Sequence, residues 1–423
     1  MKKLFLVFCA VYAVLPNLAA LDIGNGFSLE GGVKAGLLIK NTDYAGNLEG
    51  AAHGKELPLT LYFASEENNA RNGEGWLDLD YRGASWGLHM GLWAHGDIKS
   101  YTDALHLGDH YIWANFLDDM FQFKGGQGGG TPITSGGWLD ADWLGYTGLR
   151  LTFVHPMGIS VGVNLVDPGT DGIKPVNYLS TIMFGAKYAL PQDKFWVSIM
   201  WNNNPVYDDS EVDKYGGLHP RAPDADPIGQ AGNVAFGIGV DKFFFEKGGA
   251  VIDGITANLG EADKATTGTK GYGISPVETT VALKVYYPLT EKIYTELKTK
   301  YRISYGDNAD FTASETWGEL QVEPYISYQT LEFLKFEFSF NLATFINSYY
   351  LEVPINIGGH DFKEAGQVPK YGPALDYCST YRIEVKPAAV FNFEGCTAIL
   401  GYKGLFSRDH VENTTYIDFR WTF

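Results

Sequence analysis

Charged and apolar side chains alternate along several segments in the last third of the chain. Between Lys292 and Ile303, the even positions carry charged or polar residues, and the odd positions carry uncharged ones, most of them apolar or aromatic. Because successive side chains of a strand point to opposite faces, this period predicts strands with one charged and one apolar face. The pattern recurs at 319–326, 334–342 and 381–386. A dry core could not hold so many ionised groups, so one face of the predicted sheet must contact water.

Two architectures give a sheet with one wet and one apolar face. In a soluble sandwich, the apolar faces of two sheets pack together. In a closed transmembrane barrel, the apolar face meets lipid and the charged face lines a lumen. The last segment, 415–423, favours the barrel, because its odd positions from Ile417 onward are apolar and it ends on Phe423. A terminal aromatic of this kind fits the interfacial girdle of an outer-membrane barrel.

The N-terminus has the pattern of a secretory signal peptide. Lys2 and Lys3 precede an apolar run from Leu4 to Leu15, and small residues follow at Ala19 and Ala20. We predict that residues 1–20 are removed and that residues 21–423 form a single barrel domain. No apolar run after the signal is long enough for a membrane-spanning helix, which excludes a helical inner-membrane protein.

Short turns alternate with longer connections along the rest of the chain. The short turns join apolar-alternating segments as hairpins do, and they lie at 82–85, 117–119, 155–158, 190–193, 246–249, 288–291, around 329–330, and at 393–396. With both termini on the periplasmic side, they predict about 18 antiparallel strands, within roughly 16 to 20. The longer connections are predicted to be extracellular loops, and they include 57–63, 96–109, 126–143, 204–232 and 346–378. Of these, 126–143 and 204–232 are the candidates for narrowing the lumen.

The polar faces of the strands supply the predicted pore lining, in which rows of opposite charge would set a transverse field. The predicted lining residues are Trp76, Asp78, Asp80, Arg82, His89, Glu296, Lys298, Lys300, Arg302, Glu319, Glu323, Lys335, Glu337, Arg382, Glu384, Lys386, Asp418 and Arg420. By the same parity, Trp93 and Trp196 face inward. Aromatic faces in a lumen could stack on sugar rings, although such residues more often fill a barrel wall.

Composition supports a β-protein and argues against several other classes. The chain holds 26 Tyr, 26 Phe, 10 Trp and 51 Gly, a composition rich in strand formers and turn residues. Its net charge is −18 and falls by two more units without Lys2 and Lys3, so no basic patch for nucleic acid is expected. No nucleophile elbow, zinc-protease helix or phosphate loop is present, and we predict neither catalysis nor a cofactor. Glycoside hydrolysis needs only two carboxylates and is not excluded by motif.

The histidines do not form a predicted metal site. His89 and His95 would both face the lumen, but they are six residues apart on one strand, too far to share a metal. His106 and His110, with Asp109, are interpreted as part of a solvated loop.

The first third of the chain resembles the strand-turn-strand pattern of spirochaetal outer-membrane porin-like proteins. The similar blocks are 76–88, 111–116 and 120–126, and the C-terminal segment resembles the terminal signature of Gram-negative outer-membrane barrels. The resemblance implies a passive pore and supplies no catalytic residue.

These observations predict an outer-membrane porin, a closed antiparallel transmembrane β-barrel that passes small hydrophilic solutes down their gradients. Its expected partners are outer-membrane lipid, those solutes, and a barrel-assembly machinery that would engage the strand ending in Phe423. Assembly into a homo-oligomer is left open. One alternative is a surface-exposed barrel acting as an adhesin or ligand-binding protein. Another is a secreted soluble β-protein acting on polysaccharide.

Overall fold

The computed structural model describes most of the chain beyond the predicted signal peptide. The described residues are 21–43, 60–62, 74–95, 105–142, 144, 148–166, 182–190, 195–207, 227–244, 246–259, 277–307, 314–346, 356–357, 360–361, 381–407 and 411–422. The predicted signal peptide therefore lies outside the described residues.

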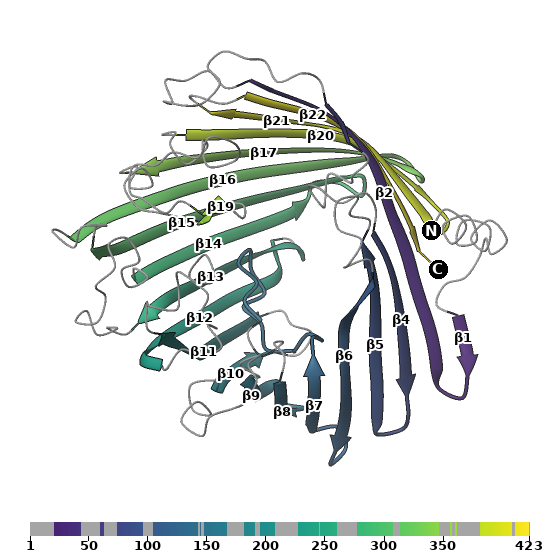
Figure 1. The fold of residues 1–423 in the computed structure, drawn as a ribbon, viewed down its shortest axis with the longest axis vertical. Helices are drawn as coiled ribbons and strands as arrows, with labels where there is room; N and C mark the ends of the chain where they lie inside the picture. The colour runs from purple at the N-terminus through teal and green to yellow at the C-terminus, as the bar shows by residue number, and fades with distance from the viewer. Residues whose placement is uncertain are drawn as a thin grey trace.

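The described chain forms a closed antiparallel barrel of 18 strands. The first nine are β2 (Phe27–Asp43), β4 (Glu74–Arg82), β5 (Trp86–His95), β6 (Leu105–Phe116), β7 (Phe121–Gln127), β8 (Gly148–His155), β9 (Ile159–Val166), β10 (Ile182–Ala189) and β11 (Phe195–Tyr207). The others are β12 (Pro227–Phe244), β13 (Lys247–Leu259), β14 (Val277–Pro288), β15 (Ile293–Asp307), β16 (Ser314–Leu331), β17 (Leu334–Ile346), β20 (Tyr381–Phe393), β21 (Cys396–Ser407) and β22 (Val411–Thr422). Their order around the wall follows their order in the sequence (Figure 1).

The barrel closes where its last strand pairs with its first. The register of β22 on β2 runs without interruption from Thr422 opposite Gly32 to Val411 opposite Asp43. Two short strands also pair with β2: β1 (Leu21–Gly24) lies beyond the end of β22, and β3 (Thr60–Tyr62) lies beyond the end of β4. A separate hairpin is formed by β18 (Asn356–Ile357) and β19 (His360–Asp361). Closure leaves the main ladder without a free edge, which is the condition for a sheet to cross a bilayer.

The short turns fall where the sequence predicted them, with shifts of two or three residues at 246–249 and around 329–330. The turn after β6 is unusual, because Leu117, Asp118 and Asp119 all have positive φ, between 52° and 63°. Asp is among the residues that tolerate this conformation, whereas Leu is strained in it. The predicted number of about 18 strands is confirmed, because the barrel has 18 antiparallel strands.

Three predicted loops were wrong in their bounds. Segment 57–63 contains β3, which pairs with the part of β2 that β4 does not reach. Segment 96–109 overlaps β6, so His106 and His110 lie in a strand rather than beside a loop. Segment 204–232 is partly strand, because β11 continues to Tyr207 and β12 begins at Pro227. Polar composition suggested loops, but these residues pair with neighbouring strands, which supply the partners of their backbone groups. Residues 208–226 lie outside the described residues.

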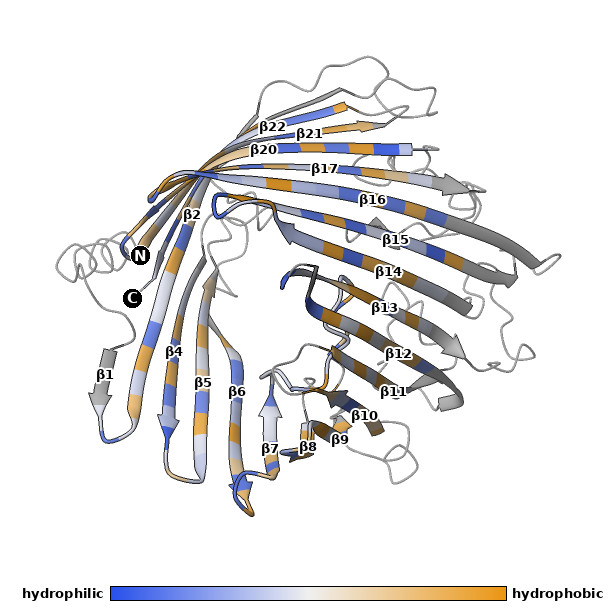
Figure 2. Cartoon of the chain, turned by 180° about the vertical axis from the view of Figure 1, so that it is seen from behind, coloured by the Kyte–Doolittle hydropathy of each residue, from blue (hydrophilic) through white to orange (hydrophobic). Residues whose placement is uncertain are grey.

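The outer face of the barrel is apolar. Along many strands, hydrophobic and hydrophilic residues alternate (Figure 2). The large apolar side chains on the outer face are exposed, with Ile112 at 54%, Ile199 at 53% and Leu400 at 49%. Aromatic rings gather near the short turns, as where Tyr81 lies 4.7 Å from Phe27 and 4.6 Å from Trp86 between ring centroids. None of the described residues belongs to a helix long and apolar enough to cross a membrane.

An exposed apolar belt around a closed barrel requires hydrocarbon outside, because contact between so much apolar surface and water is unfavourable, whereas contact with lipid is not. The predicted transmembrane β-barrel is confirmed, and the soluble sandwich is excluded. A barrel of this size with aromatic rings at its boundary belongs in an outer membrane.

Candidate functional site: the barrel lumen

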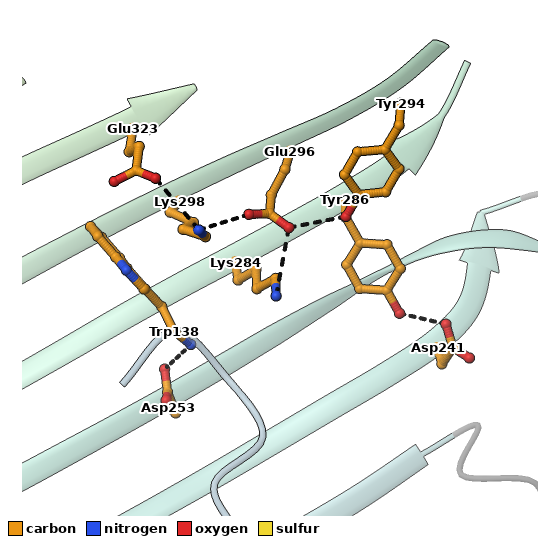
Figure 3. Close-up of polar contacts among 9 residues, drawn as sticks. All are labelled: Trp138, Asp241, Asp253, Lys284, Tyr286, Tyr294, Glu296, Lys298 and Glu323. Atoms are coloured by element: carbon orange, nitrogen blue, oxygen red, sulfur yellow. Dashed lines mark hydrogen bonds and ion pairs between the residues drawn. The ribbon is translucent and has the colours of Figure 1, made fainter. Parts of the chain in front are cut away.

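A group of charged side chains lies on the inner face of β14, β15 and β16. Glu296 accepts from Lys298 at 2.9 Å and from Lys284 at 3.5 Å, and Lys298 also reaches Glu323 at 3.4 Å (Figure 3). The side chains of Lys284, Lys298 and Glu323 stay in contact with water, at 29%, 23% and 21% exposed, whereas Glu296 between them is only 10% exposed. The arrangement is a hydrated ion-pair ladder across three strands rather than a buried charge cluster.

Other predicted lining residues pair on the same inner face. Arg302 lies 2.8 Å from Glu319, Lys335 pairs with Glu337, and Glu384 lies 3.8 Å from Lys403. Arg382 precedes Glu384 by two residues on β20, and its register places it opposite Ala343. Strand parity therefore puts these residues on the face opposite the apolar belt.

On the wall formed by β2, β4 and β22, cations lie against an aromatic ring. The ring of Trp76 has Arg420 at 5.3 Å on one strand and Lys34 at 6.0 Å on another. Lys386 lies 6.0 Å from the ring of Tyr416. Such pairs hold a guanidinium or ammonium close to the wall while leaving it accessible to solutes.

A hollow of about 500 Å³ opens beside this wall. Its lining comes from β2, β15, β16, β17, β20, β21 and β22, and it includes Lys34, Glu323, Glu337, Lys386, Asp418 and Arg420. Charges of both signs face the same space. The hollow can take water and small polar solutes, and it offers both donors and acceptors to them.

The N-terminal lining residues form a second group. Asp80 accepts from Nδ1 of His89 at 3.0 Å if that nitrogen carries the proton, and the His89 ring stacks on Tyr111 with centroids 4.9 Å apart. Asp78 and Arg82 have the same strand parity as Asp80. A smaller hollow of about 250 Å³ lies next to this group, lined by Tyr111, Trp113, Asn115, Gln122, Lys124 and Gly130.

The predicted inward tryptophans are also on this face. The ammonium nitrogen of Lys187 lies 5.5 Å from the ring centroid of Trp196. The ring of Trp93 packs on Gly108, so closely that a Cβ added to this glycine would collide with it. Asp109 and His110 belong to β6, and His110 binds the carbonyl of Gly108 at 2.8 Å. Among the described residues, no group of three His, Cys, Asp or Glu side chains is placed to hold a metal ion.

The wall from β8 to β13 carries an internal loop that was predicted only in outline. This internal loop consists of residues 128–142 and 144, between β7 and β8, and it contacts strands as far apart as β6 and β15, so it lies inside the barrel (Figure 1). Ile133, Ala141 and Leu144 pack with Met183, Met200 and Ala235 in a dry cluster. Segment 126–143 was one of the two candidates for narrowing the lumen, and its residues 128–142 lie inside the barrel.

Small residues on the inner wall make room for the internal loop. A Cβ added to Gly185 would lie 2.8 Å from Leu144 and 2.9 Å from Ile133, and a Cβ on Gly237 would collide with the backbone of Ser135. Sequence reasoning missed this wall, because these strands carry few charges on either face. The detectable signal was the run of glycines at inward parity, 162, 185, 237 and 239.

Two charged residues hold the base of the internal loop. Arg150, 4% exposed, donates to the carbonyls of Leu144 at 3.0 Å, Gly129 at 3.2 Å and Gly130 at 3.2 Å. Lys124 lies 3.4 Å from the ring centroid of Tyr111. Neither residue was among the predicted lining residues.

The tip of the internal loop is bound by Asp253 on β13, which is fully buried. Its carboxylate accepts from the Ser135 hydroxyl at 3.0 Å and from the backbone N–H groups of Leu139 at 2.8 Å, Asp140 at 3.1 Å and Trp138 at 3.3 Å. From this tip the ring of Trp138 lies 5.1 Å from the ammonium of Lys300. The internal loop thus spans from the dry wall to the charged wall of β15.

Solved structures of outer-membrane proteins are similar to this chain at low identity. No protein-family model and no curated protein matched the sequence. The structure of the outer membrane channel DcaP of Acinetobacter baumannii is similar over 96% of this chain and 100% of its own, at 12% identity and a TM-score of 0.48. A structure of OccD1 (OprD) is similar over 96% and 97%, at 10% identity and a TM-score of 0.49. OmpT, an outer membrane protein of Vibrio cholerae, is similar over 96% and 100%, at 10% identity and a TM-score of 0.43.

Proposed function

We propose that this outer-membrane barrel is a channel for the passive diffusion of small hydrophilic solutes. The observation that carries the proposal is the hydrated ion-pair ladder of Lys284, Glu296, Lys298 and Glu323 on one inner wall. A lumen filled by side chains would have buried these charges. Burial carries a desolvation cost that apolar residues at the same positions would avoid. Charges kept in contact with water inside a closed barrel are expected of an aqueous pathway.

The predicted lining residues are the proposed wall of that pathway. The hollow of about 500 Å³ beside Lys34, Lys386 and Arg420 is part of it. The internal loop occupies the opposite, dry side of the lumen, so the opening is narrower than the barrel itself. This geometry suits solutes of the size of ions and simple sugars. The proposal assigns no catalytic residue and no cofactor.

Planar-bilayer recording of the purified, refolded chain tests the proposal. We expect stepwise conductance in KCl, and swelling of proteoliposomes in isotonic solutions of small uncharged sugars that declines as the sugar grows. Folding is checked independently by heat-modifiable migration on gels. A folded protein that inserts without conductance would favour the alternative, a barrel that displays its loops as an adhesin or ligand-binding protein.

Three further expectations belong to the same proposal. Residues 1–20 are removed as a signal peptide, and the mature chain is one barrel domain. The C-terminal strand, which ends in Phe423, is engaged by a barrel-assembly machinery, while assembly into a homo-oligomer is left open. The resemblance to spirochaetal porin-like proteins supports a passive pore and is compatible with each of these expectations.

A further inference from the structure

Asp253 is an isolated carboxylate in an otherwise small and apolar stretch of β13. It lies between Ile252, which faces outward, and Gly254. Burying a carboxylate is costly unless hydrogen bonds replace its water. Here four uncharged donors from one short stretch of the internal loop do so, and all of them come from residues more than 100 positions earlier in the sequence.

The same carboxylate fixes the shape of the loop tip. The Ser135 hydroxyl that donates to Asp253 also accepts from the backbone N–H of Ala141 at 2.8 Å, and the N–H of Ser135 donates to the carbonyl of Ala141 at 3.0 Å. Residues 135–141 therefore form a closed turn around one carboxylate. The turn shares only Ala141 with the dry cluster, whose other members from the internal loop are Ile133 and Leu144.

Trp138 is the side chain that this turn presents to the lumen. Its backbone N–H donates to Asp253 (Figure 3). Its ring lies 5.1 Å from the ammonium of Lys300 on β15. Asp253 and Lys300 belong to strands separated by β14. The carboxylate thus determines where an aromatic ring meets the charged wall.

We propose that Asp253 is a positioning residue that holds Trp138 against Lys300 and so sets the width and steadiness of the open pathway. This inference rests on the proposed channel function. The pair closes the lumen beside β13 to β15, and solutes pass on the other side of Trp138, along β16 to β22 and β2, where the hollow of about 500 Å³ lies. Trp138 is then the residue of the internal loop that solutes pass.

Chemical cross-linking tests the position without relying on conductance. The full-length protein carries Trp138→Cys and Lys300→Cys in a background of Cys378→Ser and Cys396→Ser, and a short bifunctional methanethiosulfonate is added to the folded barrel. Because Asp253 binds the backbone of residue 138, the cross-link should form efficiently with Asp253 present and lose most of its yield with Asp253→Asn. An equal yield in both proteins would overturn the inference.

Bilayer recording tests the consequence for the pathway. Trp138→Ala should raise the single-channel conductance. Asp253→Asn should broaden the conductance distribution, and this broadening should shrink in the Trp138→Ala background, since the carboxylate acts through that ring. A narrow, wild-type distribution for Asp253→Asn would contradict the inference.

Asp241→Asn is the matched control, because Asp241 is a carboxylate of the neighbouring strand β12 that is hydrogen-bonded by Tyr286 and not by the internal loop. It should keep both the cross-linking yield and the narrow distribution. If Asp253→Asn does not fold, Ser135→Ala removes one donor of the same turn and should give the same changes in weaker form. A wild-type barrel that is silent in bilayers would refute the proposed channel, while the cross-linking result would still decide the role of Asp253.

Discussion

Gly129 passes so close to Lys124 that a Cβ built on the glycine would collide with the lysine ammonium nitrogen. The glycine also has φ +75°, a conformation in which other residues are strained. Both the close approach and the positive φ therefore require glycine at this position, at the base of the internal loop. The contact shows how closely the loop follows the inner wall before it crosses toward β13.

Gly129→Ala should displace the base of the internal loop, because the new methyl group needs the space of the ammonium and the backbone must leave its left-handed conformation. We expect a loss of stability of about 1 kcal/mol or more, measured by urea unfolding in lipid vesicles. Gly130→Ala is the control, since its Cβ would lie 3.6 Å from Asp142 and its φ is not positive. Equal losses of stability for both variants would contradict this account, because only Gly129 combines a positive φ with the close approach to Lys124.

Leu144→Ala should loosen the internal loop from its dry wall. Leu144 is 1% exposed and packs with Met183 and Met200, so its truncation leaves a cavity worth about 2–5 kcal/mol. We expect faster proteolysis within the loop and more current fluctuation in bilayers. Leu400→Ala, on the lipid-facing side, should change neither measurement. Resistance to proteolysis equal to that of the wild type would indicate that the loop is held by its polar contacts alone.

Glu319→Gln should shift ion selectivity toward anions, because it removes a carboxylate 2.8 Å from Arg302 and leaves that guanidinium uncompensated. Arg302→Gln should shift selectivity the opposite way. The reversal potential in a KCl gradient measures both, and the shifts should shrink at high salt, as screening requires. Shifts of the same sign in the two variants would place this pair outside the conducting path.

Phe338→Arg should destabilise the barrel far more than Ser339→Arg. Phe338 is 41% exposed on the outer face, whereas its neighbour Ser339 lines the hollow of about 500 Å³. Arginine on the lipid face costs about 2–4 kcal/mol at the bilayer midplane, and an arginine in water costs little. Unfolding titrations in vesicles give both values. Similar losses at the two positions would contradict the assignment of faces.

Much of the barrel could be predicted because its strongest constraints are local. Period-two alternation identified the inward, charged face of the strands between Glu296 and Lys386. A strand has only two faces, and only one of them can meet lipid. The short turns gave the strand number for a similar reason. The ends of β11 and β12 were missed, because pairing between two polar segments depends on the partner strand and leaves little trace in hydropathy.

The sequence by itself determined the two-faced strands and their approximate number, because alternation and turn spacing are properties of neighbouring residues. Closure of the sheet was favoured by the sequence and was decided by the pairing of β22 with β2. Only the tertiary structure decided which wall is wet and which is dry. Asp253, Arg150 and Trp138 act through contacts with residues far away in the sequence, and a single acid or aromatic residue carries no pattern of its own. Their roles arise when barrel closure brings the internal loop against β13 and β15, which no local pattern encodes.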